Sequence, residues 1–465
     1  MVATAELAPI ASVGGLGSAV AGLVRELRGT GHEVDVVLPD YTAEPLAGET
    51  RDALTTPDWT GPMQARTGTH ARAGRVTLVH GAGLARSHPY LDADGNGWPD
   101  NEHRFFAFSA AVRALAAERA PDVLHLNDWH TATALAGDLA APTVLSIHNL
   151  AYQGWADRSW LSRIGPHAHD FERDGGCNAL AGGLRRTDAT AVVSPRYREE
   201  ILRPEHGCGL SDVLAARAGA LDGILNGVES DVWDPEHDGA LVAPFDANHL
   251  DEKASTLRSV RAELGLRDDD AGTRRALTVV VSRLAHQKGI DLVVPLIPYL
   301  DGLHAQLAVL GNGDADTVGR LRAAAKDRPA DVAFVEGFDE ALGHRLIGGG
   351  DLLLMPSRFE PCGLTQMQAM RYGTLPVVTG VGGLLDTVVD ADTDPRRGTG
   401  FVAPVADPVA LLDAWHRAVR AWSNASRRRA IQKRAMRADW SWVEPARRYV
   451  ELYERVRDAR INSRS

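Results

Sequence analysis

Two series of short apolar runs, separated by helix-like stretches, constrain the fold of this chain most strongly. The first helix-like stretch is clear, because Val20, Leu23, Val24 and Leu27 recur at the spacing of one helix face. The strand-like runs cover 34–39, 122–128, 142–150 and 189–195 in the first series, and 277–284, 305–314, 332–338, 351–359 and 374–383 in the second. This alternation predicts parallel sheets covered by helices on both faces.

The break between the two series indicates two domains. A chain of 465 residues is too long for one ordinary core. A loop rich in proline, aspartate and glycine follows 223–235, and the second series begins with a helix around 250–265. We predict two doubly wound α/β domains joined near residue 245, with a wholly helical stretch over 408–460. Ligands of such sheets bind beyond the carboxyl ends of the strands, so the cleft between the domains is the expected site.

The composition argues against several classes of protein. A formal net charge of −11 argues against nucleic acid as a principal partner. Three cysteines are too few for a disulfide framework and fit a reducing compartment. No run reaches the roughly 18 apolar residues that span a bilayer, and the first residues do not resemble a signal peptide. We expect a cytoplasmic protein without a membrane or nucleic acid partner, and the sequence makes no prediction of oligomeric state.

Polar residues gather where strands of the first series end. Gly14 and Gly15 lie between a first strand and a helix, where glycines suit a structural turn about as well as a phosphate loop. Asp128 follows the second clear strand, where it either orients sugar hydroxyls or caps a helix. His148 follows the next strand, and a histidine is costly to bury there without partners. Alone, such a histidine is more often structural than catalytic.

Two cations follow the first strand of the second series. Arg283 and Lys288 stand at a strand-to-helix junction, where a pair of cations suits a diphosphate. Only four of the 50 basic residues are lysines. A lysine retained at this place therefore favours a functional role over a solvated surface pair.

Glu360 ends a later strand of the second series, within the distinctive segment 357–373. A helix that starts near Leu364, after Cys362 and Gly363, would point its first N–H groups at an anion. A buried carboxylate at Glu360 is suited to accept hydrogen bonds from the hydroxyl groups of a donor substrate. Cys362 has no base beside it in sequence, so we interpret it as a packing residue and not as a nucleophile.

The sequence predicts no metal and no cofactor. The spacing of His125 and His130 lacks the further ligands of a zinc site. The loop that starts at Asp92 and includes Asp94 resembles a calcium loop, but its twelfth position is His103 and not the usual glutamate. We therefore reject both metal interpretations.

Taken together, these motifs resemble those of bacterial glycogen synthase and plant starch synthase, the family that elongates α-1,4-glucan from ADP-glucose. The likeness extends over nearly the whole chain, and the stretch at 357–378 is the most specific. The matching stretches are HPYLDADGNGWPDNEHRF at 88–105, LNDWHT at 126–131, SIHNLAYQG at 146–154, ILNGVESDVWDP at 224–235, SRLAHQKGIDL at 282–292, GFDEALGHRLI at 337–347 and SRFEPCGLTQMQAMRYGTLPVV at 357–378.

The resemblance implies the GT-B fold, in which two Rossmann-like domains face a central cleft. It places an N-terminal, acceptor-side domain at 1–244, a nucleotide-donor domain at 245–436, and a C-terminal helix at 437–465 that packs back on the first domain. Chains of the family carry several apolar residues before the stretch that matches Val2 to Glu6. The first strand is therefore expected to be short, or the true start to lie upstream of Met1.

The resemblance also implies transfer of a hexosyl unit with retention at the anomeric carbon, without a metal. Arg283 and Lys288 would neutralise the charge that builds on the departing diphosphate. Glu360 would hold the donor ring hydroxyls, His148 would lie at the reacting centre near the 6-position of the donor, and Asp128 would lie on the acceptor side.

Further donor-binding residues follow from the same resemblance. Asn178 would contact the sugar, Phe338 would stack on the nucleotide base, and N–H groups around Gly382 and Gly383 would help to bind the diphosphate. The remaining implied donor-binding residues are Gly14, Gly15, Cys362, Gly363 and Leu364.

Three positions depart from the family pattern. The lysine before the Val-Gly-Gly-Leu loop is Ser12 here, the aspartate two residues after the leucine is Ser18, and the lysine of the Asn-Phe-Leu-Lys-Gly-Gly motif is Ala181. A bias toward arginine would have replaced lysine by arginine, so these changes delete charge. Both lost cations belong to the first domain, whereas Arg283 and Lys288 are kept.

The leading hypothesis is a hexosyltransferase of glycogen-synthase type that acts on an α-1,4-glucan or maltooligosaccharide, with the base of the nucleotide left open. The lost charges keep open a specialised glycosyltransferase or pseudo-glycosyltransferase of natural-product assembly, which joins a nucleotide-activated sugar or cyclitol to a small oligosaccharide or aminosugar. A third hypothesis is a non-catalytic glucan-binding relative. A phosphorylase is disfavoured, because none of the four lysines lies in a motif suited to pyridoxal phosphate.

Overall fold

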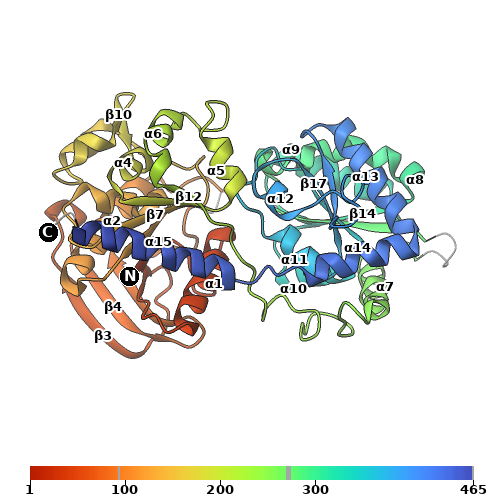
Figure 1. The fold of residues 1–465 in the computed structure, drawn as a ribbon, viewed down its shortest axis with the longest axis horizontal. Helices are drawn as coiled ribbons and strands as arrows, with labels where there is room; N and C mark the ends of the chain where they lie inside the picture. Colours follow the sequence, from red (N-terminus) through yellow and green to blue (C-terminus); the bar gives the residue numbers. More distant parts are fainter. Residues whose placement is uncertain (93–94, 269–273, 463–465) are drawn as a thin grey trace. The chain divides into compact units, whose positions relative to one another are not determined.

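The computed structural model describes residues 1–92, 95–268 and 274–462. The chain divides into two compact units (Figure 1). Unit 1 consists of Met1–Gly227 together with Trp442–Ser465, and unit 2 consists of Val228–Ser441. Each unit is built around a parallel or mainly parallel sheet, so the predicted two-domain α/β class is confirmed.

Unit 1 contains a nine-stranded sheet in the order β12-β11-β7-β6-β1-β2-β5-β4-β3. The strands from β12 to β5 are parallel, and their inner members are buried throughout, which explains the continuous apolar runs. The order reverses at β1 and β6, so the carboxyl ends of these two strands form the switch point at which such sheets bind ligands. The strands are β1 (Val2–Ala3), β2 (Val36–Pro39), β3 (Ala47–Leu54), β4 (Met63–His70), β5 (Gly74–Gly81), β6 (Leu124–Asn127), β7 (Thr143–Ile147), β11 (Ala189–Val192) and β12 (Leu221–Gly223).

No predicted strand-like run covers β5 or β12, and two further β features of unit 1 are also absent from the sequence prediction. Strands β4 and β3 extend the sheet beyond β5 in antiparallel pairing, and β3 is largely exposed. A second, three-stranded antiparallel sheet consists of β8 (Trp155–Ala156), β10 (Gly176–Asn178) and β9 (Glu172–Arg173). Strand β3 is too exposed and the strands of the second sheet are too short to carry a continuous apolar run, and the residues of β4 are mostly polar.

The helices of unit 1 follow the expected alternation. Helix α1 buries the predicted face of Val20, Leu23, Val24 and Leu27. The helices are α1 (Gly15–Gly29), α2 (Asn101–Arg119), α3 (Trp129–Ala132), α4 (Ala179–Arg186), α5 (Pro195–Ile201), α6 (Ser211–Ala216) and α15 (Val443–Asn462). No helix among the described residues is long and apolar enough to span a membrane.

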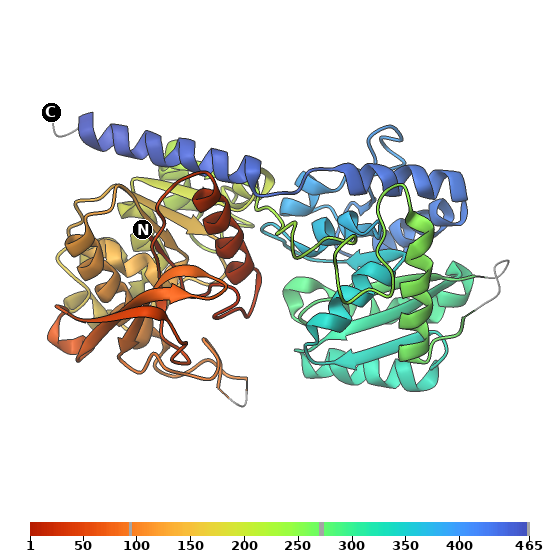
Figure 2. The same cartoon turned by 90° about the horizontal axis from the view of Figure 1, so that it is seen from below.

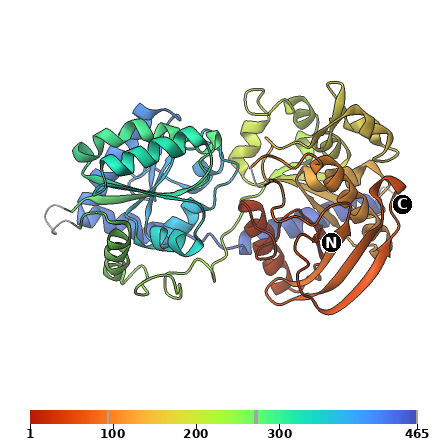
Figure 3. The same cartoon turned by 180° about the vertical axis from the view of Figure 1, so that it is seen from behind.

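Unit 2 contains a six-stranded, wholly parallel sheet in the order β15-β14-β13-β16-β17-β18. This is the doubly wound order 3-2-1-4-5-6, with its switch point between β13 and β16. Figure 3 shows helices on both faces of the sheet. The strands are β13 (Ala276–Val281), β14 (Ala305–Gly311), β15 (Val332–Glu336), β16 (Leu352–Met355), β17 (Leu375–Thr379) and β18 (Phe401–Ala403). The helices are α7 (Lys253–Leu264), α8 (Leu300–Leu303), α9 (Ala315–Asp327), α10 (Glu340–Gly349), α11 (Thr365–Arg371), α12 (Gly382–Thr387), α13 (Pro408–Ser423) and α14 (Ala425–Arg437).

The boundaries of the two units differ from the predicted boundaries at 244 and 436. The loop that follows Val228 belongs to unit 2, because its side chains are anchored there. Asp238 Oδ2 accepts hydrogen bonds from His344 Nδ1 and Tyr372 Oη, each at 2.7 Å. The Trp233 ring stacks on His344 with the ring centroids 3.9 Å apart. The sequence signals a loop at this place but not which unit the loop packs on.

Helix α15 lies on unit 1, next to α1 and β7 (Figures 1 and 2). Its buried residues Tyr449, Leu452 and Val456 belong to the core of unit 1. Trp442 precedes the helix and lies so close to α1 that a Cβ atom at Gly22 would be 1.9 Å from its Nε1 atom. The return of the chain to unit 1 therefore depends on the absence of a side chain at Gly22.

Adding a methyl group at Gly22 is expected to weaken the attachment of the C-terminal segment. The Trp442 ring is buried, and overpacking of this kind costs about 1–3 kcal/mol. We expect Gly22→Ala to lower Tm and to speed limited proteolysis of α15. Gly29→Ala in the same helix is the matched control, because a Cβ there meets no atom within 4 Å. It should leave Tm unchanged or slightly raised, and equal behaviour of the two variants would contradict the packing account.

Candidate functional site

Three polar side chains of unit 1 follow strands that meet at the switch point. Glu6 follows β1, Asp128 follows β6 and His148 follows β7. All three strands are neighbours in the sheet or separated by one strand, with Val2 in register with His125 and Asn127 with Ser146. Glu6 and Asp128 are buried, with 3% and 7% of their surface exposed. The carboxyl edge of this sheet therefore brings together side chains that lie far apart in the sequence.

Glu6 holds the glycine loop at the start of α1. Its Oε2 atom accepts hydrogen bonds from the backbone N–H groups of Val13 at 2.6 Å and Gly14 at 3.1 Å. Its Oε1 atom accepts a hydrogen bond from Tyr90 Oη at 2.6 Å. The carboxylate thus occupies the position at the helix start where a phosphate would bind. Of the two interpretations of Gly14 and Gly15, this geometry favours the structural turn. Sequence reasoning did not single out Glu6 as a site residue.

Asp128 has a strained backbone and a perturbed carboxyl group. Its φ of 55° and ψ of −174° lie in a region that residues other than glycine rarely adopt, at a cost of about 1–3 kcal/mol. The strained turn brings Oδ1 to 2.7 Å from the backbone nitrogen of His148, which donates to it. Burial, with a smaller contribution from the charge of Glu6, raises the pKa of Asp128 to about 7. This carboxyl group is therefore able to exchange a proton near neutral pH.

The hydrogen bonds of Asn127 determine the tautomer of His148. Asn127 Nδ2 donates to the carbonyl of Ala3 at 3.0 Å, so Oδ1 of the same amide faces His148 Nε2 at 2.9 Å. An amide oxygen only accepts, so the proton of the imidazole lies on Nε2 and the acceptor is Nδ1. Burial lowers the pKa of His148 to about 4, so the ring is neutral at pH 7. The histidine is thus prepared to accept a hydrogen bond from a hydroxyl group through Nδ1.

Asn178 is bound to protein groups on both sides of its amide. Oδ1 accepts from the backbone nitrogen of Ala181 at 2.8 Å and so caps α4, while Nδ2 donates to Gln153 Oε1 at 2.7 Å. Gln153 Nε2 in turn donates to the carbonyl of Cys208 at 2.7 Å. The structure therefore shows Asn178 as a residue that connects β10 to the loop after β7. Its predicted contact with a sugar stays a prediction.

None of the three residues predicted to depart from the family pattern supplies a cation to the site residues of unit 1. Ser12 is exposed, Ser18 is half-buried, and Ala181 is fully buried within α4. Within the described parts of the chain, neither Glu6 nor Asp128 has an ion-pair partner. These residues of unit 1 therefore comprise carboxyl groups and a neutral imidazole, an environment suited to hydroxyl groups and not to a diphosphate.

The switch point of unit 2 carries the two predicted cations and the predicted carboxylate. Lys288 Nζ lies 2.7 Å from Glu360 Oε2, which also accepts from Ser357 Oγ at 2.9 Å. Glu360 is only 4% exposed, and the Lys288 side chain is 19% exposed. Arg283 is exposed, and no hydrogen bond or ion pair of its side chain is found among the described residues. Sequence reasoning correctly placed all three beyond the ends of β13 and β16.

One glycine permits this ion pair to form. Gly289 follows the 3₁₀ turn η7 (His286–Lys288) and has a φ of +66°. A Cβ atom at Gly289 would lie 2.1 Å from the carbonyl oxygen of Pro356, just after β16. The backbone after β13 can therefore approach the backbone after β16 only with glycine at this position.

The backbone N–H group of Gly383, which is expected to donate to the diphosphate, already has a hydrogen-bond partner in this structure. Its N–H group donates to the carbonyl of Glu360 at 3.0 Å, because α12 packs directly against the loop after β16. A Cβ at Gly383 would lie 2.3 Å from the carbonyl oxygen of Cys362, which shows how close this approach is. The N–H of Gly383 therefore supports Glu360 instead of facing a ligand. Gly382, at the start of α12, has a positive φ of 42°.

The remaining predicted residues of unit 2 lie in the same loops. Cys362 is 5% exposed, as expected of a packing residue. Gly363 has a φ of +72°, and Leu364 directly precedes α11, which begins one residue later than predicted. Phe338 lies beyond the end of β15 with 91% of its surface exposed. Its predicted stacking on a base stays a prediction.

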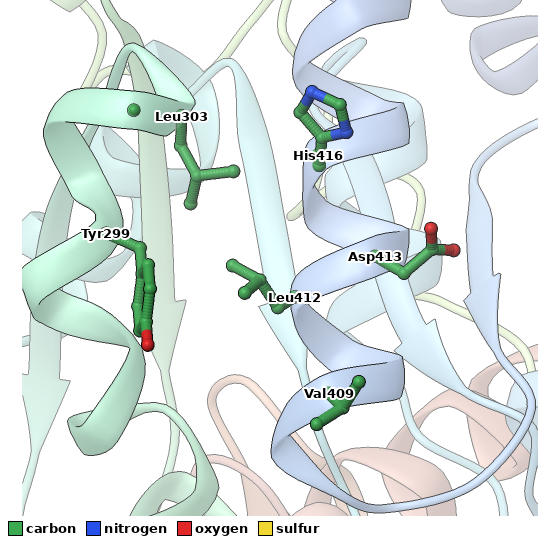
Figure 4. Close-up of a pocket in the computed structure, with 7 residues that line it drawn as sticks. Tyr299, Leu303, Val409, Leu412, Asp413 and His416 are labelled. Carbon is green, nitrogen blue, oxygen red and sulfur yellow. The ribbon is translucent and has the colours of Figure 1, made fainter.

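A groove of about 380 Å³ lies elsewhere in unit 2, between the segment that ends in α8 and helix α13 (Figure 4). Tyr299, Leu303, Val409 and Leu412 line it, and none of the predicted site residues does. No group of three or more potential metal ligands is found in the part of the chain that the structure describes. Asp94 of the rejected calcium loop lies outside the described residues.

Comparisons with known proteins agree with this arrangement. The family model described as "Starch synthase catalytic domain" matches residues 1–216, and the one described as "Glycosyl transferases group 1" matches residues 267–437. The chain is 39% identical to glycogen synthase of Acidiphilium cryptum over 96% of this chain and 97% of that protein. It is 41% identical to glycogen synthase of Alkalilimnicola ehrlichii over 96% of both. The chain belongs to the glycogen synthase and starch synthase family.

A solved structure supports the same assignment for the fold. The catalytic domain of starch synthase IV from Arabidopsis thaliana, bound to ADP and acarbose, matches with a TM-score of 0.87 and 31% identity over 98% of both chains. This member of the glycogen synthase family is therefore a glycosyltransferase with two α/β units of GT-B type. The comparisons bear out the resemblance on which the sequence hypothesis rests.

The buried Asp128 carboxyl group predicts a pH-dependent stability. Its pKa is raised from 3.8 to about 7 in the folded chain, so the folded state holds a proton between these values that the unfolded state has lost. Wild-type stability therefore falls as pH rises from about 4 to about 7. Asp128→Asn removes this loss, so its Tm relative to wild type should rise by at least about 2–4 °C between pH 5 and pH 8.

Asp174→Asn is the matched control for this measurement. Asp174 also has a positive φ, of 48°, but is exposed. Its substitution should change Tm by the same amount at both pH values. A constant Tm difference for Asp128→Asn would show that its carboxyl group is not perturbed.

Proposed function

We propose that this glycosyltransferase transfers a glucosyl unit from ADP-glucose to an α-1,4-glucan or maltooligosaccharide, with retention at the anomeric carbon and without a metal. The observation that carries the proposal is the group Arg283, Lys288 and Glu360 at the switch point of unit 2. The names of the relatives and the ADP and acarbose bound to the similar starch synthase support it. The bond between C1 of glucose and the diphosphate oxygen breaks, a bond forms between C1 and a hydroxyl oxygen of the acceptor, and the proton of that hydroxyl group passes to the departing phosphate oxygen of ADP.

In this proposal the cations of unit 2 stabilise the departing diphosphate. Arg283 is exposed, so it can pair with a phosphate without first breaking an internal ion pair. Lys288 is held by Glu360 before the donor binds, at a distance of 2.7 Å. The phosphate would take over Lys288, and Glu360 would then accept hydrogen bonds from the sugar hydroxyls. Cations that are already in place lower the barrier, because no reorganisation is needed as charge develops.

The residues of unit 1 supply groups suited to hydroxyls. The Nδ1 atom of neutral His148 accepts a hydrogen bond, as the hydroxyl at the 6-position of the donor requires. Asp128, with a pKa near 7, suits a hydrogen bond from the hydroxyl group of the acceptor. Among the described residues neither Glu6 nor Asp128 has an ion-pair partner, so in this proposal the diphosphate binds to unit 2 alone. We therefore expect a lower affinity for the nucleotide-sugar donor than a site with lysines at positions 12 and 181 would have.

Loss of either cation of unit 2 should reduce activity to a similar extent, but only one of the two losses should also reduce stability. Arg283→Ala and Lys288→Ala are each expected to lower kcat/KM by about 10²–10³-fold, the usual effect of removing one group that stabilises developing charge. Lys288→Ala should also lower Tm, because it leaves buried Glu360 without its cation. Arg283→Ala should leave Tm unchanged. Lys326→Ala, an exposed lysine on α9, is the control and should change neither quantity.

A donor screen tests the proposal directly. The protein is incubated with maltooligosaccharide and each of ADP-, UDP-, GDP- and dTDP-glucose, and product length, nucleotide release and the anomeric configuration by NMR are followed. We expect extension of α-1,4-linked chains and release of ADP. Failure to extend, together with thermal protection by another nucleotide-activated sugar or cyclitol, would favour the specialised transferase. Protection by maltooligosaccharide alone would favour a non-catalytic glucan-binding protein.

A further inference from the structure

Helix α15 contributes two tyrosine hydroxyl groups to a polar cluster inside unit 1. Tyr453 Oη lies 2.8 Å from His125 Nδ1, and Tyr449 Oη lies 3.2 Å from Ser146 Oγ. His125 Nε2 and Ser146 Oγ are themselves 2.7 Å apart. The four side chains therefore form one continuous chain of hydrogen bonds between α15 and strands β6 and β7. Neither tyrosine takes part in the function proposed above.

Along strands β6 and β7, this cluster lies one layer before the candidate catalytic groups at the carboxyl ends. His125 and Asn127 are two residues apart on β6, and Ser146 and His148 are two residues apart along β7 and its end. Side chains two residues apart on a strand point to the same face, and Asn127 is in register with Ser146. The Tyr453–His125–Ser146–Tyr449 chain is thus one layer below the Asn127–His148 pair.

Ser146 connects this cluster to the strained aspartate. Its side chain belongs to the hydrogen-bonded chain, while its carbonyl oxygen accepts from the backbone nitrogen of Asp128 at 2.8 Å. Asp128 in turn accepts from the backbone nitrogen of His148. A displacement of Ser146 would therefore move both groups that face the substrate in the proposed function.

The hydrogen-bonding capacity of His125 is fully used. Burial lowers its pKa to about 3, so the ring is neutral, with one donor nitrogen and one acceptor nitrogen. Both nitrogens have a partner, so the hydroxyl groups of Tyr453 and Ser146 take opposite roles. Removal of the Tyr453 hydroxyl leaves a buried ring nitrogen without a partner, which favours a shift of β6.

The hydroxyl groups are not needed to hold α15 on unit 1. Leu452 and Val456 are buried in the core, and Arg460 Nη2 donates to the carbonyl of Leu139 at 2.9 Å. Arg455 pairs with Asp222. The aromatic rings also pack on His125, with centroids 5.4 Å away for Tyr449 and 5.7 Å for Tyr453. A phenylalanine at either position keeps this packing and deletes the hydrogen bond.

We propose that Tyr449 and Tyr453 are positioning residues, which act through His125 and Ser146 to align Asp128 and His148 for glycosyl transfer. This inference rests on the proposed function for its catalytic meaning. The hydrogen bonds also give it a consequence that does not involve turnover, because they hold Asp128 in the buried, strained position that raises its pKa.

The test uses Tyr449→Phe, Tyr453→Phe and the double variant of the full-length protein, with Tyr299→Phe as the matched control. Tyr299 is an exposed tyrosine of unit 2 and should change nothing. With the donor that the wild type turns over, we expect the double variant to lose about 10–100-fold in kcat, with KM for the donor changed less than about twofold. Its Tm should stay within a few degrees of wild type. Unchanged kcat in the double variant would overturn the proposal, as would a loss of activity matched by a loss of folded protein.

A second measurement separates this inference from the proposed function. Asp128→Asn is combined with the double tyrosine variant, and Tm is measured at pH 5 and pH 8 without any substrate. If the tyrosines position Asp128, the pH-dependent gain from Asp128→Asn becomes smaller in the double-variant background. A gain of the same size as in wild type would refute the positioning role, even for a protein that proves inactive with ADP-glucose. Inactivity of the wild type with every donor would count against the proposed function alone.

Discussion

A parallel strand that is buried on both faces can present polar side chains to a ligand only near its ends, and both units depend on this constraint. In unit 2 it brings the residues after β13 and β16 together, so that Lys288 meets Glu360. In unit 1 it brings Glu6, Asp128 and His148 to one edge of the sheet. Close backbone approach makes this possible, because Gly289 allows the two strand ends of unit 2 to touch and Asp128 accepts a strained backbone conformation.

The candidate site residues of the two units differ in charge. Unit 2 holds an exposed arginine and a lysine that is paired with a carboxylate. The site residues of unit 1 comprise two carboxyl groups and a neutral histidine, and Glu6 binds the N–H groups that begin α1. In the proposed function the diphosphate therefore binds to the first set and hydroxyl groups to the second. Ser12 and Ala181, the positions at which the sequence resemblance predicts lysine, carry no charge in unit 1.

Much of the fold and part of the site could be predicted from the sequence. The apolar runs located most of the buried parallel strands, though not β5, β12 or β18, because burial on both faces leaves a continuous pattern. Arg283, Lys288 and Glu360 follow such runs directly, so their position at strand ends was also predictable. The exposed strand β3 and the two-residue strand β8 have no such pattern. The junction near 245 was misplaced because a polar loop does not reveal that Asp238 is bound by His344 and Tyr372.

The sequence by itself determined the fold class, the family and the position of Arg283, Lys288 and Glu360 at strand ends of unit 2, because each of these depends on local patterns and motifs. Only the tertiary structure showed that Glu6 fills the start of α1, that Asn127 orients His148, and that α15 supports both strands beneath Asp128. Tyr90 is 84 positions from Glu6 and Tyr453 is 328 positions from His125. Contacts at such separations are set by how strands and helices pack. No local pattern records which distant side chain will satisfy a buried donor or acceptor.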